Sequence, residues 1–184
     1  MDALTITIIA IVILLLLILL IWYIKVLNKI RINKVKVEES LSGIDIALTQ
    51  RYDVLTKMID VVKSYTKHEK ETFTEIVKIR NNMSIEEKES SNKQMNEALE
   101  QIKLIAENYP ELRSSENYQN LQEAITKVEE DLQVSRKKYN SSISNFNELV
   151  VTFPNVIVAK TSGNSTKKFF EADENKKEDV KINL

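Results

Sequence analysis

The chain has 184 residues, with 26 basic and 27 acidic side chains, so its net charge is −1. This balance does not favour nucleic-acid binding, which usually needs a basic face. The sequence has no cysteine, one histidine, two glycines and two prolines. Disulfides, thiol nucleophiles and thiolate metal sites are therefore excluded, and one chain cannot bind a metal through a histidine pair. So few glycines and prolines disfavour all-β folds and glycine-rich phosphate loops, and they predict long helices.

The first predicted element is a transmembrane helix over residues 4–24. Every residue from Ala3 to Ile24 is uncharged, and all except Thr5 and Thr7 are apolar. About 21 residues at ~1.5 Å rise give roughly 31 Å of helix, enough to cross a hydrocarbon core of about 30 Å. The run is too long for the core of a cleaved signal peptide and lacks a small-residue cleavage site. We therefore expect an uncleaved anchor in the lipid bilayer.

The residues after the apolar run predict the orientation of this anchor. Trp22 and Tyr23 end the run, where amphipathic rings favour the headgroup region. Five basic residues follow before the first acidic one: Lys25, Lys29, Arg31, Lys34 and Lys36. The positive-inside rule then places residues 1–3 outside and the bulk of the chain in the cytoplasm. A specific site for anionic lipid is the alternative interpretation of the basic cluster.

Residues 25–153 are predicted to form a helical bundle whose first helix covers about 27–65. Residues 29–37 alternate as in a strand, but a lone strand would have no partner, so we expect the helix to continue through them. From residue 41 the apolar residues follow a heptad pattern. They are Leu41, Ile44, Leu48, Leu55, Met58, Val62 and Tyr65.

Arg51 interrupts this apolar stripe and has two interpretations. Its long side chain could extend past the core to water or to a surface carboxylate. It could instead form a buried ion pair with a neighbouring helix. The sequence leaves this choice open.

The second bundle helix is predicted over about 67–108, with a kink near 81–84. Thr66 and Glu69 have the spacing of a capping box, and so do Ser84 and Glu87. His68 would then be a solvated turn residue. We expect residues 86–96 to be polar and solvated, and Pro110 to end the helix near residue 108.

The third helix, over about 115–153, has the most regular pattern, and Ser114 or Ser115 can cap it. Its first core position is occupied at seven-residue spacing by Tyr118, Ile125, Leu132, Tyr139, Phe146 and Phe153, and its second by Leu121, Val128, Ser135, Ser142 and Leu149. This period favours antiparallel packing against the first two helices at about +20°. Residues 154–184 are predicted to be a loop, a helical turn near Phe169–Phe170 and a frayed tail.

Short motifs along nearly the whole chain resemble those of the LemA family. They are Ser42-x-Ile44-Asp45 with Leu48 and Arg51-Tyr52-Asp53; Val62-Lys63-x-Tyr65-x-x-His68-Glu69; Glu107-x-Tyr109-Pro110-x-Leu112; Arg136-x-x-Tyr139-Asn140; Phe153-Pro154; and Phe170-Glu171-Ala172. The resemblance implies an all-α fold with one N-terminal transmembrane helix followed by an antiparallel bundle. It also implies a single-pass protein of the bacterial cell (inner) membrane.

We expect the chain to be a membrane-tethered, non-enzymatic interaction or scaffold module with an unknown protein partner. The candidate contact residues are charged or polar members of the motifs: Asp45, Arg51, Asp53, Glu107, Arg136 and Asn140. The alternative interpretation is that they form structural ion pairs between helices. No catalytic residue, metal site or cofactor is predicted.

Two other functions remain open. The heptads could pair helices between chains and so give a self-associating envelope or signalling scaffold. An enzyme with a carboxylate or di-metal site in the bundle is the other alternative. A di-metal site would need Glu-x-x-His motifs on two helices, which one histidine cannot supply. The adjacent pairs Glu86–Glu87 and Glu129–Glu130 do not share a helix face.

Overall fold

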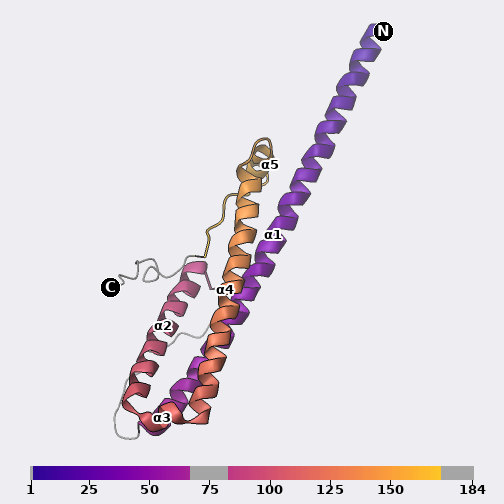
Figure 1. The fold of residues 1–184 in the computed structure, drawn as a ribbon. Helices are drawn as coiled ribbons and strands as arrows, with labels where there is room; N and C mark the ends of the chain where they lie inside the picture. The colour runs from indigo at the N-terminus through magenta and orange to yellow at the C-terminus, as the bar shows by residue number, and fades with distance from the viewer. Residues whose placement is uncertain (1, 67–82, 171–184) are drawn as a thin grey trace, which may run out of the picture. The chain divides into compact units, whose positions relative to one another are not determined.

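The computed structural model describes residues 2–66 and 83–170, where the regular secondary structure is helical and there is no strand (Figure 1). The helices are α1 (Ala3–Tyr65), α2 (Ile85–Asn108), α3 (Pro110–Ser114), α4 (Glu116–Val151) and α5 (Asn155–Thr161). The predicted all-α fold class, with a long apolar N-terminal helix continuing into a helical bundle, is confirmed. The predicted start of the second helix, His68 and the first half of the expected kink at 81–84 lie outside the described residues.

The chain divides into two compact units. The anchor unit comprises Met1–Glu39 and Asn140–Lys168, and the bundle unit comprises Ser40–Tyr139 and Phe169–Leu184. Each of the long helices α1 and α4 therefore contributes one part to each unit.

Helix α1 is uninterrupted for 63 residues and includes residues 29–37, as predicted. Near its N-terminus it contains a segment long and apolar enough to cross a membrane, with a mean hydropathy of 3.5 and no buried residue. Residues 3–21 are all exposed, and the first half-buried side chains are Trp22 and Tyr23. Burial by the protein therefore begins where the apolar run ends.

The core of the anchor unit is apolar and comes from three helices. Its buried side chains are Val26, Ile30 and Val37 of α1, Ile143, Phe146, Leu149 and Val150 of α4, and Val158 and Ala159 of α5. Figure 1 shows the C-terminal part of α4 running antiparallel to the segment of α1 in this unit. This is the orientation that the heptad pattern predicts.

Helix α5 was not predicted, and it ends in a Schellman motif. The amide of Gly163 donates to the Lys160 carbonyl at 3.2 Å, and the amide of Asn164 donates to the Ala159 carbonyl at 2.9 Å. Gly163 has a φ of 69°, the left-handed conformation that this motif requires. The helical turn expected at Phe169–Phe170 is wrong, because residues 164–170 contain no helix.

The segment after α5 is held against α4 by one side chain. The Asn147 amide nitrogen donates to the Lys167 carbonyl at 2.9 Å, and the Lys167 amide donates to the Asn147 side-chain oxygen at 2.7 Å. The Lys167 ammonium also lies 5.8 Å from the centre of the Phe146 ring. The segment that follows α5 has no regular secondary structure, and these contacts hold it in place.

The core of the bundle unit joins α1, α2, α3 and α4 around one cluster of buried side chains. It consists of Leu55, Met58, Ile59 and Val62 of α1, Met95, Leu99, Ile102, Ile105 and Ala106 of α2, Leu112 of α3, and Tyr118 and Ile125 of α4. Most predicted heptad positions are therefore buried. Tyr65, at the end of α1, is 39% exposed, and Phe153, beyond the end of α4, is 76% exposed.

The ends of the described helices have the predicted local signals. At the start of α2 the Glu87 amide donates to Ser84 Oγ at 3.1 Å, and the Ser84 amide donates to Glu87 Oε2 at 2.6 Å. This reciprocal pair is the expected capping box. Helix α2 ends at Asn108, before Tyr109 and Pro110. Ser115 caps α4, because its Oγ accepts the Tyr118 amide at 3.3 Å.

Candidate functional site

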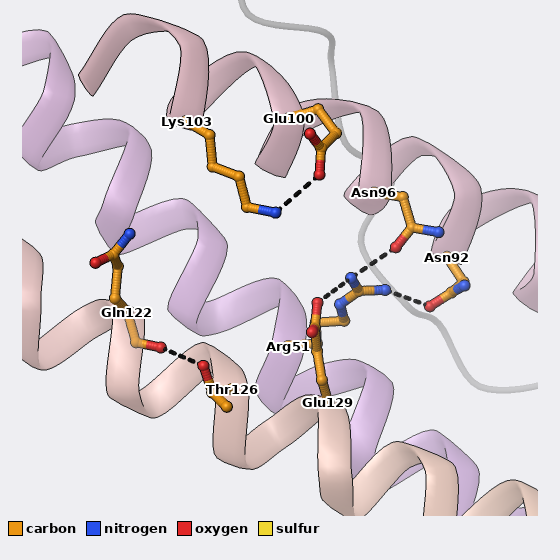
Figure 2. Close-up of polar contacts among 8 residues, drawn as sticks. All are labelled: Arg51, Asn92, Asn96, Glu100, Lys103, Gln122, Thr126 and Glu129. Carbon is orange, nitrogen blue, oxygen red and sulfur yellow. Dashed lines mark hydrogen bonds and ion pairs between the residues drawn. The ribbon is translucent and has the colours of Figure 1, made fainter. Parts of the chain in front are cut away.

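The guanidinium of Arg51 joins three helices of the bundle unit (Figure 2). Its Nη1 donates to Asn92 Oδ1 at 2.6 Å, and its Nη2 donates to Asn96 Oδ1 at 2.7 Å. Nη2 also donates to Glu129 Oε1 at 2.8 Å, which makes an ion pair between α1 and α4. We call Arg51, Asn92, Asn96 and Glu129 the arginine cluster.

Burial explains why the arginine cluster exists. Arg51 is only 3% exposed, and an isolated buried charge would be strongly unfavourable. Charge-assisted hydrogen bonds that Arg51 donates to two amide oxygens and a carboxylate compensate for the lost water. The structure combines the two interpretations of Arg51: its guanidinium is buried and pairs with a neighbouring helix, but the carboxylate that it meets, Glu129, is 41% exposed.

A second charged contact lies between α1 and α2. Lys88 is 2% exposed, and its Nζ lies 2.6 Å from Asp45 Oδ1. That oxygen is also buried and receives no well-directed hydrogen bond, so the contact is chiefly a charge–charge attraction. Asp45 keeps 38% of its side chain exposed, which limits the cost of burying the pair.

These contacts correct the expectation that residues 86–96 are solvated. Lys88, Ser91 and Asn92 are each 2% exposed, and Met95 is fully buried. The N-terminal half of α2 thus packs a polar face inward, whereas its C-terminal half packs an apolar one.

A cleft of about 470 Å³ opens between α2 and α4 beside the arginine cluster. We call it the α2–α4 cleft. Its lining consists of Leu99 and Lys103 of α2 and Gln119, Gln122, Glu123, Ile125, Thr126 and Glu129 of α4. Leu99 and Ile125 are buried, and most of the polar lining residues are exposed. Lys103 lies at this edge and pairs with Glu100 at 2.8 Å, as Figure 2 shows.

The other predicted site residues are not gathered at the cleft. The guanidinium carbon of Arg136 lies 4.8 Å from the centre of the Phe170 ring, an arrangement typical of a cation–π contact. Asp53 on α1 and Glu107 on α2 are exposed. Asn140 is half-buried and belongs to the anchor unit. Of the six, Asp45 and Arg51 form ion pairs, with Lys88 and Glu129 respectively.

Four residues of these polar contacts were missed from the sequence: Lys88, Asn92, Asn96 and Glu129. A signal did exist, because Lys88, Asn92 and Asn96 are spaced four apart and lie on one face of a helix. Glu129 gave no such signal, since it is 78 positions from Arg51.

Two buried tyrosines have perturbed acidity. Burial raises the pKa of Tyr139, and the nearby charges of Glu89 and Glu86 raise it further. Burial also raises the pKa of Tyr118, although a hydrogen bond from Gln122 partly opposes the effect. Both phenols stay protonated at neutral pH, so they act there as hydrogen-bonding core residues. Among the described residues, no group of three or more His, Cys, Asp or Glu side chains could hold a metal ion.

A candidate membrane span that continues into an all-helical bundle defines a class of membrane-anchored helical-bundle proteins. The sequence model of the LemA family matches residues 40–184, and the chain belongs to that family. It is also similar to Protein LemA of Metamycoplasma hominis, with 26% identity over 163 residues, covering 86% of this chain and 74% of the relative.

Proposed function

We propose that the protein is a membrane-tethered, non-enzymatic binding module whose α2–α4 cleft receives a segment of a partner protein. The cleft is the observation that carries this proposal. A volume of about 470 Å³ accommodates a few side chains and falls within the usual range for binding pockets. LemA proteins are a membrane-associated family, which fits the tether.

The chemistry of the cleft suits a polypeptide. Its floor is apolar at Leu99 and Ile125, so it can bury an apolar side chain of the partner. Around this floor, the amide, hydroxyl and carboxylate groups of α4 can accept hydrogen bonds from backbone amides. Glu129 already accepts from Arg51, the Gln122 amide nitrogen donates to Tyr118, and the Thr126 hydroxyl donates to the Gln122 carbonyl. A binding site with an apolar centre and a polar rim is typical of protein interfaces.

The arginine cluster supports the cleft and does not bind the partner itself in this proposal. Arg51 donates to three groups of its own chain and is nearly inaccessible. The interpretation of Asp45 and Arg51 as structural ion pairs is therefore favoured over direct partner contact. Asp53 and Glu107 are exposed and remain candidates for contact.

Photo-crosslinking in intact membranes tests this function. A photoreactive amino acid replaces Glu123 in the cleft, and a matched variant carries it at Lys137, an exposed position of α4 outside the cleft. We expect a discrete adduct from position 123 and not from position 137, identified by mass spectrometry. Equal adducts at both positions, or none, would contradict the proposal. An adduct of two copies of this chain would support the self-associating scaffold instead.

The orientation with the N-terminus outside follows from the basic residues after the span, as the positive-inside rule predicts. The absence of cysteine allows single cysteines to be introduced without background. In intact cells or spheroplasts, a membrane-impermeant maleimide should label Asp2→Cys directly and Lys137→Cys only after permeabilisation. The reverse pattern would show the opposite orientation.

A further inference from the structure

We propose that the corner between α4 and α5 is a second membrane contact, in which Phe153 and Ile157 lie in the lipid interface beside the anchor. Lys160 would face anionic headgroups there. This inference rests on the proposed membrane anchoring through residues 4–24. It adds a surface of the folded domain that touches lipid, next to the helix that crosses it.

The position of α5 along α1 carries the inference. The Tyr23 hydroxyl oxygen and Thr161 Oγ1 lie 3.4 Å apart and share a hydrogen bond. Tyr23 ends an apolar run whose roughly 31 Å of helix fills the hydrocarbon core, so its hydroxyl lies at headgroup level. Thr161 must lie at the same level, and it is the last residue of α5. Figure 1 shows the α4–α5 corner at the end of α4 nearer the N-terminal half of α1.

Three large apolar side chains are exposed close together at this corner. Phe153 is 76% exposed, Ile157 is 51% exposed and Val151 is 58% exposed. In water these side chains would leave apolar area unburied, whereas the lipid interface can cover it. The same physics therefore explains why these residues are apolar and why no described part of the protein covers them.

The charges around the corner match an anionic surface. Residues 151–170 contain three lysines and no acidic residue. Lys160 is exposed at the end of α5, and Lys25 and Lys29 are exposed on α1 just after the span. Each basic residue near an anionic leaflet adds to the attraction, which falls off within about 10 Å at moderate salt.

The corner is held in place, so its apolar residues are presented in a defined position. Val158 is fully buried and Ala159 is 1% exposed, which docks one face of α5 on the anchor unit. The Schellman motif at Gly163 ends α5, and the two Asn147–Lys167 hydrogen bonds hold the chain that follows. Ile157 lies on the opposite, exposed side of this short helix.

Spin labels on single cysteines in the full-length protein test the inference. The variants are Phe153→Cys and Ile157→Cys, with Val134→Cys as the control because Val134 is 66% exposed in the bundle unit. The protein is reconstituted in vesicles of phosphatidylcholine with anionic phosphatidylglycerol. For each spin label we measure two collision rates. One is with oxygen, which concentrates in lipid, and the other is with a water-soluble nickel chelate.

We expect the labels at 153 and 157 to collide several-fold more with oxygen than with the chelate, and the label at 134 to show the reverse. Chelate-dominated collisions at 153 and 157 would overturn the inference, and so would low collision with both reagents, which indicates coverage by protein. Sedimentation with the vesicles after a carbonate wash is measured on the same samples. Loss of sedimentation would instead refute the anchoring on which the inference rests.

Comparing vesicles with and without anionic lipid tests the role of Lys160. In pure phosphatidylcholine the preference of the 153 label for oxygen should be smaller than in anionic vesicles. Adding Lys160→Gln to Phe153→Cys should remove most of that difference. An unchanged difference would contradict the role of this lysine.

Discussion

The two units bury different kinds of side chain. The buried residues that the structure describes in the anchor unit are apolar, whereas the bundle unit also buries Ser40, Arg51, Thr66, Lys88, Ser91 and Asn92. Burial of apolar side chains stabilises a fold, but it does not require any one alignment of the helices, because its free energy depends mainly on the buried area. A buried charge with several required partners can in addition fix the register of the helices that supply them. Apolar contacts therefore stabilise the anchor unit, whereas the bundle unit also has polar contacts that can fix how its helices align.

The largest effect is expected in the apolar core of the anchor unit. Phe146 is 1% exposed, so Phe146→Ala should lower the free energy of unfolding by about 3–5 kcal/mol through lost burial and a cavity. Phe153→Ala, seven residues later at an exposed position, should change it by less than about 0.5 kcal/mol in detergent. Urea unfolding of the full chain, followed by circular dichroism, measures both. Equal effects would contradict the assignment of Phe146 to a core.

A somewhat smaller effect is expected in the polar core. Arg51→Ala should cost about 3 kcal/mol, because it leaves buried amide oxygens and a carboxylate without their donor. Glu129→Ala should cost about 1 kcal/mol, since Glu129 is 41% exposed on its side chain. A double-mutant cycle should give a coupling of about 0.5–3 kcal/mol. A coupling near zero would mean that the ion pair does not hold α1 to α4.

The two glycines, one in each unit, should respond in opposite directions. Gly163→Ala should destabilise the protein by about 1 kcal/mol, because a φ of 69° is unfavourable for a residue with a Cβ atom. Gly43→Ala should stabilise α1 by up to about 1 kcal/mol. There the added Cβ would meet only Ser135 Oγ, at an ordinary 3.8 Å. Thermal melting of both variants checks the signs, and the same sign for both would be inconsistent with this geometry.

The smallest effect is a pH dependence in the bundle unit. The pKa of Tyr139 is raised above the ordinary tyrosine value of about 10, chiefly by burial. The unfolded chain then loses the phenol proton at lower pH than the folded protein does. Stability from this group is complete below about pH 10 and is lost as pH rises towards the folded pKa. Tyr139→Phe should make the alkaline decline in urea midpoint shallower, and an unchanged decline would assign it to other groups.

The sequence predicted the apolar part of the fold because burial of apolar residues leaves a periodic signal. The heptads of α1 and α4, the capping box at Ser84 and the helix end before Pro110 all follow from local chemistry. Phe153 was placed in the core wrongly, because the seven-residue period continues past Val151 although the helix does not. Helix α5 was missed because it has only seven residues, too few for a clear period.

The polar core was harder to predict for a physical reason. Hydrophobic periodicity does not report a helix face that is buried through hydrogen bonds, so residues 86–96 were interpreted as solvated. The sequence placed Arg51 on the buried stripe but could not identify its partners, which are 41, 45 and 78 residues away. The α2–α4 cleft is likewise formed by residues distant in sequence, and no local pattern indicates it.

The Asn147 side chain has a consequence for the chain after α5. Its amide offers one donor and one acceptor to Lys167, as a neighbouring strand in a sheet would. We therefore expect the Lys167 backbone hydrogen to exchange slowly with deuterium although it lies in no helix or strand. An aspartate could accept that hydrogen but could not return a donor, so this pairing needs a side chain that donates from one atom and accepts at another, as a carboxamide does.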